Sequence, residues 1–183
     1  AGRGGENANL RPTTRTEKKE YLGGAGARAR RFRRGAIGGP ARDYGHDLAA
    51  MRAAVTRETR IVFVANPNNP TGTWIAPDAL EAFVASIPAQ TLVVLDEAYN
   101  EYLDPARHAP SVAWTGTYAN LIVSRTFSKA YGLAALRVGY GIMNAEVAGM
   151  LNRVRQPFNV NALAQAAAVA ALADTEYVDA SRT

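Results

Sequence analysis

A single lysine, Lys129, stands among ten arginines in the chain from Ala41 onward. An arginine keeps its charge and does not form imines, whereas a lysine amine can lose its proton and condense with a carbonyl group. The residues around this lysine are hydroxyl-bearing or small, in the sequence Ser124-Arg-Thr-Phe-Ser-Lys-Ala-Tyr-Gly-Leu. A surplus surface lysine is the alternative interpretation, but this context favours a nucleophile that attacks a carbonyl.

Two polar residues follow the apolar run at 92–95. Asp96 comes directly after it and is expected to be poorly solvated, so its carboxylate needs a cation or a hydrogen-bond donor. A helix cap or a structural ion pair would meet that need, and so would the protonated ring nitrogen of a ligand. Tyr99 lies three residues on, at the spacing of one helical turn, and can offer its phenol to the same ligand. Glu97 is expected to point elsewhere and to be structural.

An anion-binding set is also predicted. Arg137 lies eight residues beyond the lysine, and its guanidinium matches the geometry of a phosphate group. Thr126 and Ser128 could add neutral donors, while an ordinary surface arginine is the alternative. Asn69 lies at the tip of the turn Asn66-Pro-Asn-Asn-Pro-Thr-Gly-Thr, where it either forms the turn or offers an amide to a ligand.

Other kinds of site have less support. His46 is interpreted as a helix-entry residue and His108 as a loop residue, so neither is expected to be catalytic. The chain has no cysteine, which excludes disulfides, thiolate nucleophiles and cysteine-ligated metals. The spacing of His, Asp and Glu indicates no metal site, and neither a GxGxxG nor a Walker-type phosphate loop occurs.

Alternating apolar runs and amphipathic segments must position these residues. Strands are predicted at 61–65, 92–95, 121–123 and 138–142, and the first is apolar throughout, as in a strand buried on both faces. Helices are predicted from Asp47 to about Val55, from Pro77 to about Ile87 and from about Ala162 to Ala173. This alternation predicts an α/β fold with a mostly parallel sheet flanked by helices. Three polar clusters follow three strand ends, so they are expected to share one site.

Length and composition restrict the class of protein. The chain has 183 residues, of which 48% are apolar and 20% charged, which fits one globular domain with a core. No apolar run approaches the roughly 20 residues of a membrane helix, and no signal-peptide stretch opens the chain. We therefore expect a cytoplasmic protein with no membrane partner.

The positive charge is concentrated in residues 1–40, which carry a net charge of +7 and nine glycines, whereas the remaining residues carry a net charge of −2. The apolar residues of this segment follow neither a helical nor a strand period. Three interpretations compete: a disordered basic tail, a nucleic-acid-binding arm, and a segment translated in the wrong reading frame. The arm is the weakest of them, because few aromatic residues lie near the charge, and no nucleic-acid partner is expected.

Three segments resemble, in order and spacing, the large domain of the fold-type-I pyridoxal-phosphate aminotransferases. They are Asn66-Pro-Asn-Asn-Pro-Thr-Gly-Thr, Leu95-Asp-Glu-Ala-Tyr and Ser124-Arg-Thr-Phe-Ser-Lys-Ala-Tyr-Gly-Leu-Ala-Ala-Leu-Arg-Val-Gly-Tyr. Two more, Asp43-Tyr-Gly-His-Asp-Leu and Arg155-Gln-Pro-Phe-Asn-Val-Asn-Ala-Leu-Ala-Gln-Ala-Ala, are most similar to the histidinol-phosphate aminotransferases. The resemblance covers about Ala41 to Asp174.

The resemblance implies a role for each matching residue. Lys129 would hold pyridoxal 5'-phosphate covalently and, once released by the substrate, would carry a proton between substrate and cofactor. Asp96 would pair with the ring nitrogen of the cofactor and keep the ring an electron sink. Tyr99 and Asn69 would hydrogen-bond its phenolic oxygen.

The same resemblance assigns the cofactor phosphate to Arg137, with Thr126 and Ser128. It implies amino-group transfer between histidinol phosphate and 2-oxoglutarate, in histidine biosynthesis, by a homodimer when full length. The alternatives are an aromatic or aspartate-type aminotransferase, and a pyridoxal-phosphate-dependent decarboxylase or lyase of the same fold. A basic-tailed binding module without activity is the non-enzymatic alternative.

Members of the family are considerably longer than this chain. Residues 41–183 are therefore expected to be a partial cofactor-binding large domain without the C-terminal small domain, and inactive by themselves. Where residues 1–40 stand, the family has strands and helices of the same sheet. High-GC DNA read out of frame yields Arg, Gly, Ala and Pro in excess, so a mistranslated segment is slightly favoured over a disordered one.

Overall fold

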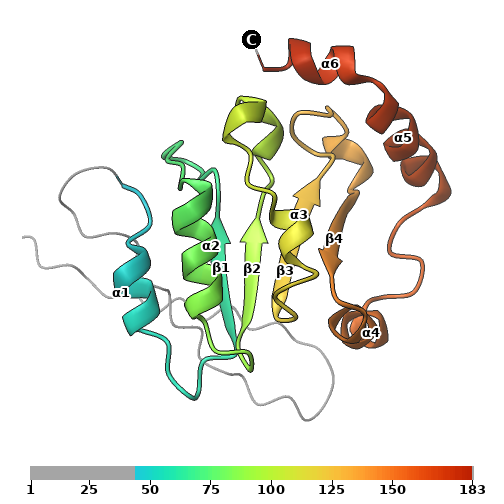
Figure 1. Cartoon of the computed structure of the whole chain (residues 1–183). Coiled ribbons are helices and arrows are strands. Elements are labelled where there is room, and N and C mark those ends of the chain that lie inside the picture. Colours follow the sequence, from blue (N-terminus) through green and yellow to red (C-terminus); the bar gives the residue numbers. More distant parts are fainter. Residues whose placement is uncertain (1–43, 183) are drawn as a thin grey trace, which may run out of the picture. The chain divides into compact units, whose positions relative to one another are not determined.

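The computed structural model describes residues 44–182, and the predictions for residues 1–40 lie outside that range. Four strands form one sheet in the order β1 to β4: β1 (Ile61–Ala65), β2 (Leu92–Asp96), β3 (Leu121–Thr126) and β4 (Gly139–Met143). The first three strands are parallel and β4 is antiparallel to β3 (Figure 1). The predicted α/β fold with a mostly parallel sheet is confirmed, and the predicted strands are within a few residues of those observed.

Six α-helices and three short 3₁₀ segments complete the described part of the chain. The helices are α1 (Leu48–Ala53), α2 (Pro77–Ser86), α3 (Ser111–Trp114), α4 (Ala145–Val154), α5 (Ala162–Ala173) and α6 (Thr175–Ala180). The 3₁₀ segments are η1 (Asn100–Tyr102), η2 (Pro105–Arg107) and η3 (Ala134–Leu136). Within residues 44–182, no helix has the length and apolar character needed to cross a bilayer.

Local sequence explains where the helices begin. The Asp47 carboxylate accepts a hydrogen bond of 2.8 Å from the N–H of Ala50, which caps α1 as its position predicted. Pro77 occupies the first turn of α2, where its missing N–H costs nothing. Asn144 and Asn161 cap α4 and α5 in the same way as Asp47. The predicted starts at Pro77 and Ala162 are therefore confirmed.

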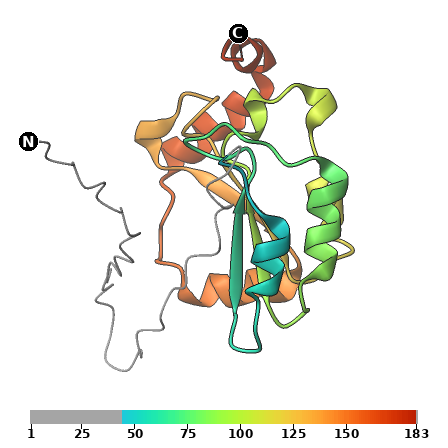
Figure 2. The same ribbon diagram turned by 90° about the vertical axis from the view of Figure 1, so that its left-hand side faces the viewer.

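The main core lies between the sheet and helices α1, α2 and α3, which lie on one face (Figure 2). It contains buried side chains from three strands and three helices: Val64, Val93, Leu95, Leu121, Val123, Met51, Leu80, Phe83, Val84 and Trp114. A smaller cluster on α5 joins Ala164 and Ala168 to Phe127 and Val138, which flank the turn after β3. This second cluster anchors the turn that carries Lys129.

The prediction that β1 is buried on both faces is wrong. Val64 is fully buried, but Ile61 and Phe63 are 45% and 57% exposed. Successive side chains of a strand point to opposite faces, and α1 and α2 pack against one of them. Within residues 44–182, β1 has β2 as its one neighbour in the sheet. A continuous apolar run therefore did not distinguish an edge strand with one covered face from a fully enclosed strand.

Leu95→Ala is expected to lower the free energy of unfolding by about 2–5 kcal/mol, because it opens a cavity in a fully buried position of the central sheet. Urea denaturation followed by circular dichroism measures the loss. The matched control is Leu163→Ala on α5, where the side chain is 79% exposed and the change should stay within about 0.5 kcal/mol. Equal losses at the two positions would contradict the assignment of the core.

Candidate functional site at the carboxyl edge of the sheet

The strand register places three polar turns at the same edge of the sheet. Asp96 pairs with Ala65 on β1 and with Ser124 on β3, so β1 and β2 end together and β3 continues only to Thr126. In Figure 1 the segments that follow these strands leave the sheet on the same side. The predicted convergence of the three clusters at one edge is confirmed as a matter of geometry.

The first turn is stabilised by a buried amide. Asn66 is 5% exposed, and its side chain accepts a hydrogen bond of 2.8 Å from the N–H of Ile75 and donates to the carbonyl of the same residue at 3.3 Å. The loop between these two residues is thus closed at its base. Asn69 lies at its exposed tip, as expected, and donates its amide N–H to the hydroxyl of Tyr99.

The lysine turn is closed by the backbone. The N–H of Gly132 donates to the carbonyl of Lys129 at 2.9 Å, and the N–H of Leu133 donates to the carbonyl of Phe127 at 2.9 Å. Gly132 has a φ of +69°, and a Cβ there would lie 2.5 Å from the Tyr177 hydroxyl oxygen of α6, so a larger residue at this position would be strained. The turn presents the Lys129 ammonium 5.2 Å from the centre of the Tyr99 ring.

Asn69, Tyr99 and Lys129 therefore form one cluster, with one residue from each turn. Hydrogen bonding to Lys129 is the largest effect on the Tyr99 hydroxyl and lowers its pKa below the usual range, and hydrogen bonding to Asn69 lowers it further. A tyrosine hydroxyl with a lowered pKa, between an ammonium and an amide, can stabilise negative charge on a neighbouring oxygen. The sequence predicted that these three side chains lie at one edge, and the structure shows the contacts between them.

Asp96 lies at the same edge, but its expected burial is wrong. Its side chain is exposed, and its carboxylate accepts a hydrogen bond of 3.1 Å from the N–H of Ala98. The reason is that Asp96 is the last residue of β2, where its side chain leaves the apolar layer that encloses Leu95. The carboxylate therefore has one backbone donor and free capacity to accept from a ligand.

The residues expected to bind an anion lie next to the lysine turn. One Arg137 nitrogen, Nη1, donates to the Ser128 hydroxyl at 3.4 Å and to the carbonyl of Ala134 at 2.7 Å. The Thr126 hydroxyl accepts from the N–H of Ser128 at 3.1 Å. Arg137 is exposed and adopts a left-handed backbone conformation, with φ at 54°. These contacts join Thr126, Ser128 and Arg137 into a second small cluster.

The two histidines have structural contacts. His46 Nε2 lies 2.9 Å from the carbonyl oxygen of Ala65 at the end of β1. His108 Nε2 lies 3.3 Å from the carbonyl oxygen of Leu103 in the same loop region. In each histidine, Nε2 lies within hydrogen-bond distance of a backbone carbonyl oxygen. This agrees with the interpretation of His46 as a helix-entry residue and of His108 as a loop residue.

Sequence reasoning missed one residue of the site region, Arg125. Its Nε and Nη2 donate to the same carboxylate oxygen of Glu97, at 2.9 and 2.8 Å. The Glu97 side chain is 3% exposed, so this ion pair is largely buried. A buried glutamate one residue after a strand required a cation, and the arginine one residue before Thr126 was the available signal.

The pKa of Tyr99 gives a direct test of the cluster. Ultraviolet titration of the wild type, with Tyr99→Phe subtracted, should show a tyrosine that ionises at lower pH than free tyrosine. Lys129→Met should raise that pKa most, and Asn69→Ala should raise it less, because the lysine has the larger effect. A Tyr99 component that ionises at the ordinary tyrosine pH would show that the three side chains do not interact.

Comparison with known proteins assigns this arrangement to a family. The family model described as "Aminotransferase class I and II" matches residues 19–183, a longer stretch than the resemblance from Ala41 to Asp174. Histidinol-phosphate aminotransferase 2 of Ralstonia nicotianae is 66% identical over 139 residues, covering 76% of this chain and 37% of that protein. Histidinol-phosphate aminotransferase 1 of Cupriavidus pinatubonensis is 64% identical over 141 residues, covering 77% and 38%.

Solved structures show the same fold. Histidinol-phosphate aminotransferase of Sinorhizobium meliloti, in complex with pyridoxal-5'-phosphate, superposes with a TM-score of 0.69 at 41% identity, over 74% of this chain and 37% of that one. L-threonine-O-3-phosphate decarboxylase of Porphyromonas gingivalis superposes with a TM-score of 0.59 at 28% identity, over 65% and 36%.

The chain spans 37% and 38% of the length of the two relatives named above, so it corresponds to a part of such a protein. The family match covers most of the chain, including all three turns that meet at the sheet edge. From the match and the fold together, the chain belongs to the class I and II aminotransferases.

Proposed function

We propose that the protein of which this chain is a part transfers an amino group between histidinol phosphate and 2-oxoglutarate, with pyridoxal 5'-phosphate as cofactor. The Lys129–Tyr99–Asn69 cluster at the carboxyl edge of the sheet is the observation that carries the proposal. The choice of substrate is supported by relatives with 57–66% identity that are named histidinol-phosphate aminotransferases.

The side chains at the carboxyl edge of the sheet carry groups that fit this cofactor. Lys129 supplies an amine that can bond to an aldehyde, and Tyr99 and Asn69 supply two groups for a phenolic oxygen. Asp96 supplies an exposed carboxylate for a protonated ring nitrogen, and the exposed guanidinium of Arg137 suits a phosphate. When bound, the cofactor supplies an aldehyde for covalent attachment and a ring that accepts electrons.

Each of the residues at the edge then has a separate role. Lys129 holds the cofactor and afterwards carries a proton at its Nζ, since it is the single amine at the described part of the edge. Tyr99 and Asn69 orient the phenolic oxygen and stabilise its negative charge. Asp96 keeps the ring nitrogen protonated, while Thr126, Ser128 and Arg137 hold the phosphate. Each of these roles is a proposal that follows the positions of the side chains.

A decarboxylase or lyase of the same fold is the second candidate. It is supported by the superposition with L-threonine-O-3-phosphate decarboxylase, which has lower identity than the aminotransferase of Sinorhizobium meliloti. Incubation of a version completed to the relatives' length with histidinol phosphate and 2-oxoglutarate separates the two. Glutamate formation supports the transferase, and release of carbon dioxide from an amino acid supports the decarboxylase.

Covalent labelling tests the cofactor proposal on the chain itself. The chain has three lysines, Lys18, Lys19 and Lys129, so the first two serve as internal references. Incubation with pyridoxal 5'-phosphate, reduction with borohydride and peptide mass spectrometry should show preferential labelling of Lys129. Labelling no greater than that of Lys18 and Lys19 would overturn the proposal. A homodimer and a cytoplasmic location remain predictions for the whole protein.

A further inference from the structure

The Glu97–Arg125 ion pair joins the two turns that carry Tyr99 and Lys129. Glu97 precedes Tyr99 by two residues, and Arg125 precedes Lys129 by four. The N–H of Glu97 donates to the carbonyl of Ser124 at 2.9 Å, so the backbone of β2 and β3 is still paired at this level. The ion pair lies at this level, where β2 has just ended and β3 has one residue left before the lysine turn.

The geometry of the ion pair restricts the orientation of the Arg125 guanidinium. Two nitrogens of one guanidinium, Nε and Nη2, converge on a single Glu97 oxygen at 2.9 and 2.8 Å. A planar group held at two points cannot rotate freely about its long axis, in contrast to a lysine ammonium. Burial by itself lowers the pKa of Arg125, but the charge and hydrogen bond of Glu97, together with those of Tyr140, outweigh this and raise it.

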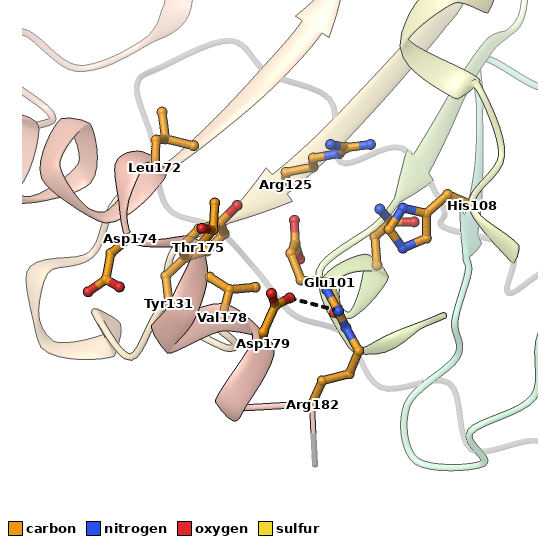
Figure 3. Close-up of a pocket in the computed structure, with 11 residues that line it drawn as sticks. Glu101, His108, Arg125, Tyr131, Leu172, Asp174, Thr175, Val178, Asp179 and Arg182 are labelled. Atoms are coloured by element: carbon orange, nitrogen blue, oxygen red, sulfur yellow. Dashed lines mark hydrogen bonds and ion pairs between the residues drawn. The ribbon is translucent and has the colours of Figure 1, made fainter. Parts of the chain in front are cut away.

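A second carboxyl group lies beside the pair. Glu101 of η1 is 8% exposed, and its Oε2 has no hydrogen-bond partner among the described residues. It lines a cavity of about 250 Å³ together with Arg125 of β3 and residues of α6 (Figure 3). Burial raises the pKa of Glu101 above its usual range.

Backbone and ring contacts continue from the ion pair into both turns. On one side, the N–H of Asn100 donates to the carbonyl of Glu97 at 3.0 Å, which closes the turn around Tyr99. On the other side, the buried ring of Phe127 packs 4.9 Å from the ring of Tyr131, between Arg125 and the lysine. These contacts connect the ion pair to the turns that carry Tyr99 and Lys129.

We propose that the Glu97–Arg125 ion pair positions Lys129 over the ring of Tyr99, and that both are positioning residues of the edge site. Their place in catalysis rests on the proposed function, but their effect on the Lys129–Tyr99 contact does not. The pair acts through the two turns and touches neither cofactor nor substrate.

Nuclear magnetic resonance of the whole chain tests this without cofactor. Reductive methylation with isotopically labelled formaldehyde gives one dimethylamine signal for each of the three lysines, besides that of the N-terminal amine, and Lys129→Arg identifies the signal of Lys129. In the wild type this signal should be displaced upfield by the Tyr99 ring current, and Tyr99→Leu should remove the displacement.

The decisive variant is Glu97→Gln with Arg125→Gln, because two amides can hydrogen-bond and leave no unpaired buried charge. The upfield displacement should be lost, while circular dichroism remains that of the wild type. Glu101→Gln is the matched control, since it replaces a neighbouring buried carboxyl group outside the ion pair by an amide of the same shape, and it should keep the displacement. Val84→Ala, in the core at α2, controls for a general loss of stability and should also keep it.

Three results would overturn the inference: no displacement in the wild type, a displacement that survives the double variant, or an equal loss in Val84→Ala. Borohydride labelling of unmethylated samples of the same variants keeps the two proposals apart, because a dimethylated lysine cannot condense with an aldehyde. If the wild type is labelled at Lys129 and the double variant is labelled equally fast, the positioning role fails and the proposed function stands. If the displacement behaves as expected but the wild type is not labelled, the proposed function fails and the positioning role stands.

Discussion

Lys129→Arg is expected to abolish amino-group transfer in a version completed to the length of the relatives. Arginine keeps the positive charge beside Tyr99 but cannot bond covalently to an aldehyde or release a proton near neutral pH. Loss of a positioned proton carrier alone costs about 10²–10⁴-fold in rate, and loss of covalent attachment adds to this. Turnover is measured as glutamate formed from histidinol phosphate and 2-oxoglutarate.

The fold should survive this substitution, because Lys129 is exposed and the turn is closed by backbone bonds of Gly132 and Leu133. Circular dichroism and thermal unfolding provide that control. Arg137→Lys is a second variant for comparison. It keeps a positive charge in the cluster of Thr126, Ser128 and Arg137 and places a new lysine close to position 129. Substantial turnover by Lys129→Arg would show that another group forms the covalent bond.

Asp96→Asn is expected to retain the cofactor but to reduce turnover by orders of magnitude. An amide can still hydrogen-bond a ring nitrogen, but it does not favour the protonated ring that withdraws electrons. One lost charge-assisted contact weakens binding by roughly 1.5–3 kcal/mol and costs more at the transition state. The exposed position of Asp96 makes the change tolerable for folding.

The measurement compares the dissociation constant of the cofactor with turnover in the same variant. Glu146→Gln in the first turn of α4 is the matched control, because it removes an exposed carboxylate from a helix that follows the antiparallel strand β4 and none of the three edge turns. That control should change neither quantity. Near-native turnover in Asp96→Asn would refute the electronic role of Asp96.

Much of the architecture followed from local patterns. Asp47, Pro77 and the apolar period of α2 define helix starts through capping and burial, which depend only on residues close in sequence. The strands were recognisable because short β-branched runs must be buried. The site residues were found for a similar reason: each polar cluster directly follows such a run, and parallel strands end at one edge.

The sequence did not determine which groups are shielded from water at that edge. Asp96 was expected to be buried and is exposed, while Glu97, one residue further, is buried against Arg125. Adjacent residues point in opposite directions, so burial depends on where the strand ends and which turn covers it. The same argument explains β1, whose apolar run is covered on one face while Phe63 is exposed.

The order of the motifs therefore determined by itself the α/β class, the approximate strands and the membership of Asn69, Tyr99 and Lys129 in one edge cluster. The tertiary structure decided the antiparallel direction of β4, the exposure of Asp96 and the pairing of Glu97 with Arg125 across 28 residues. These features arise from contacts between segments distant in sequence, and the free energy of such contacts depends on which side chains the packed sheet brings together.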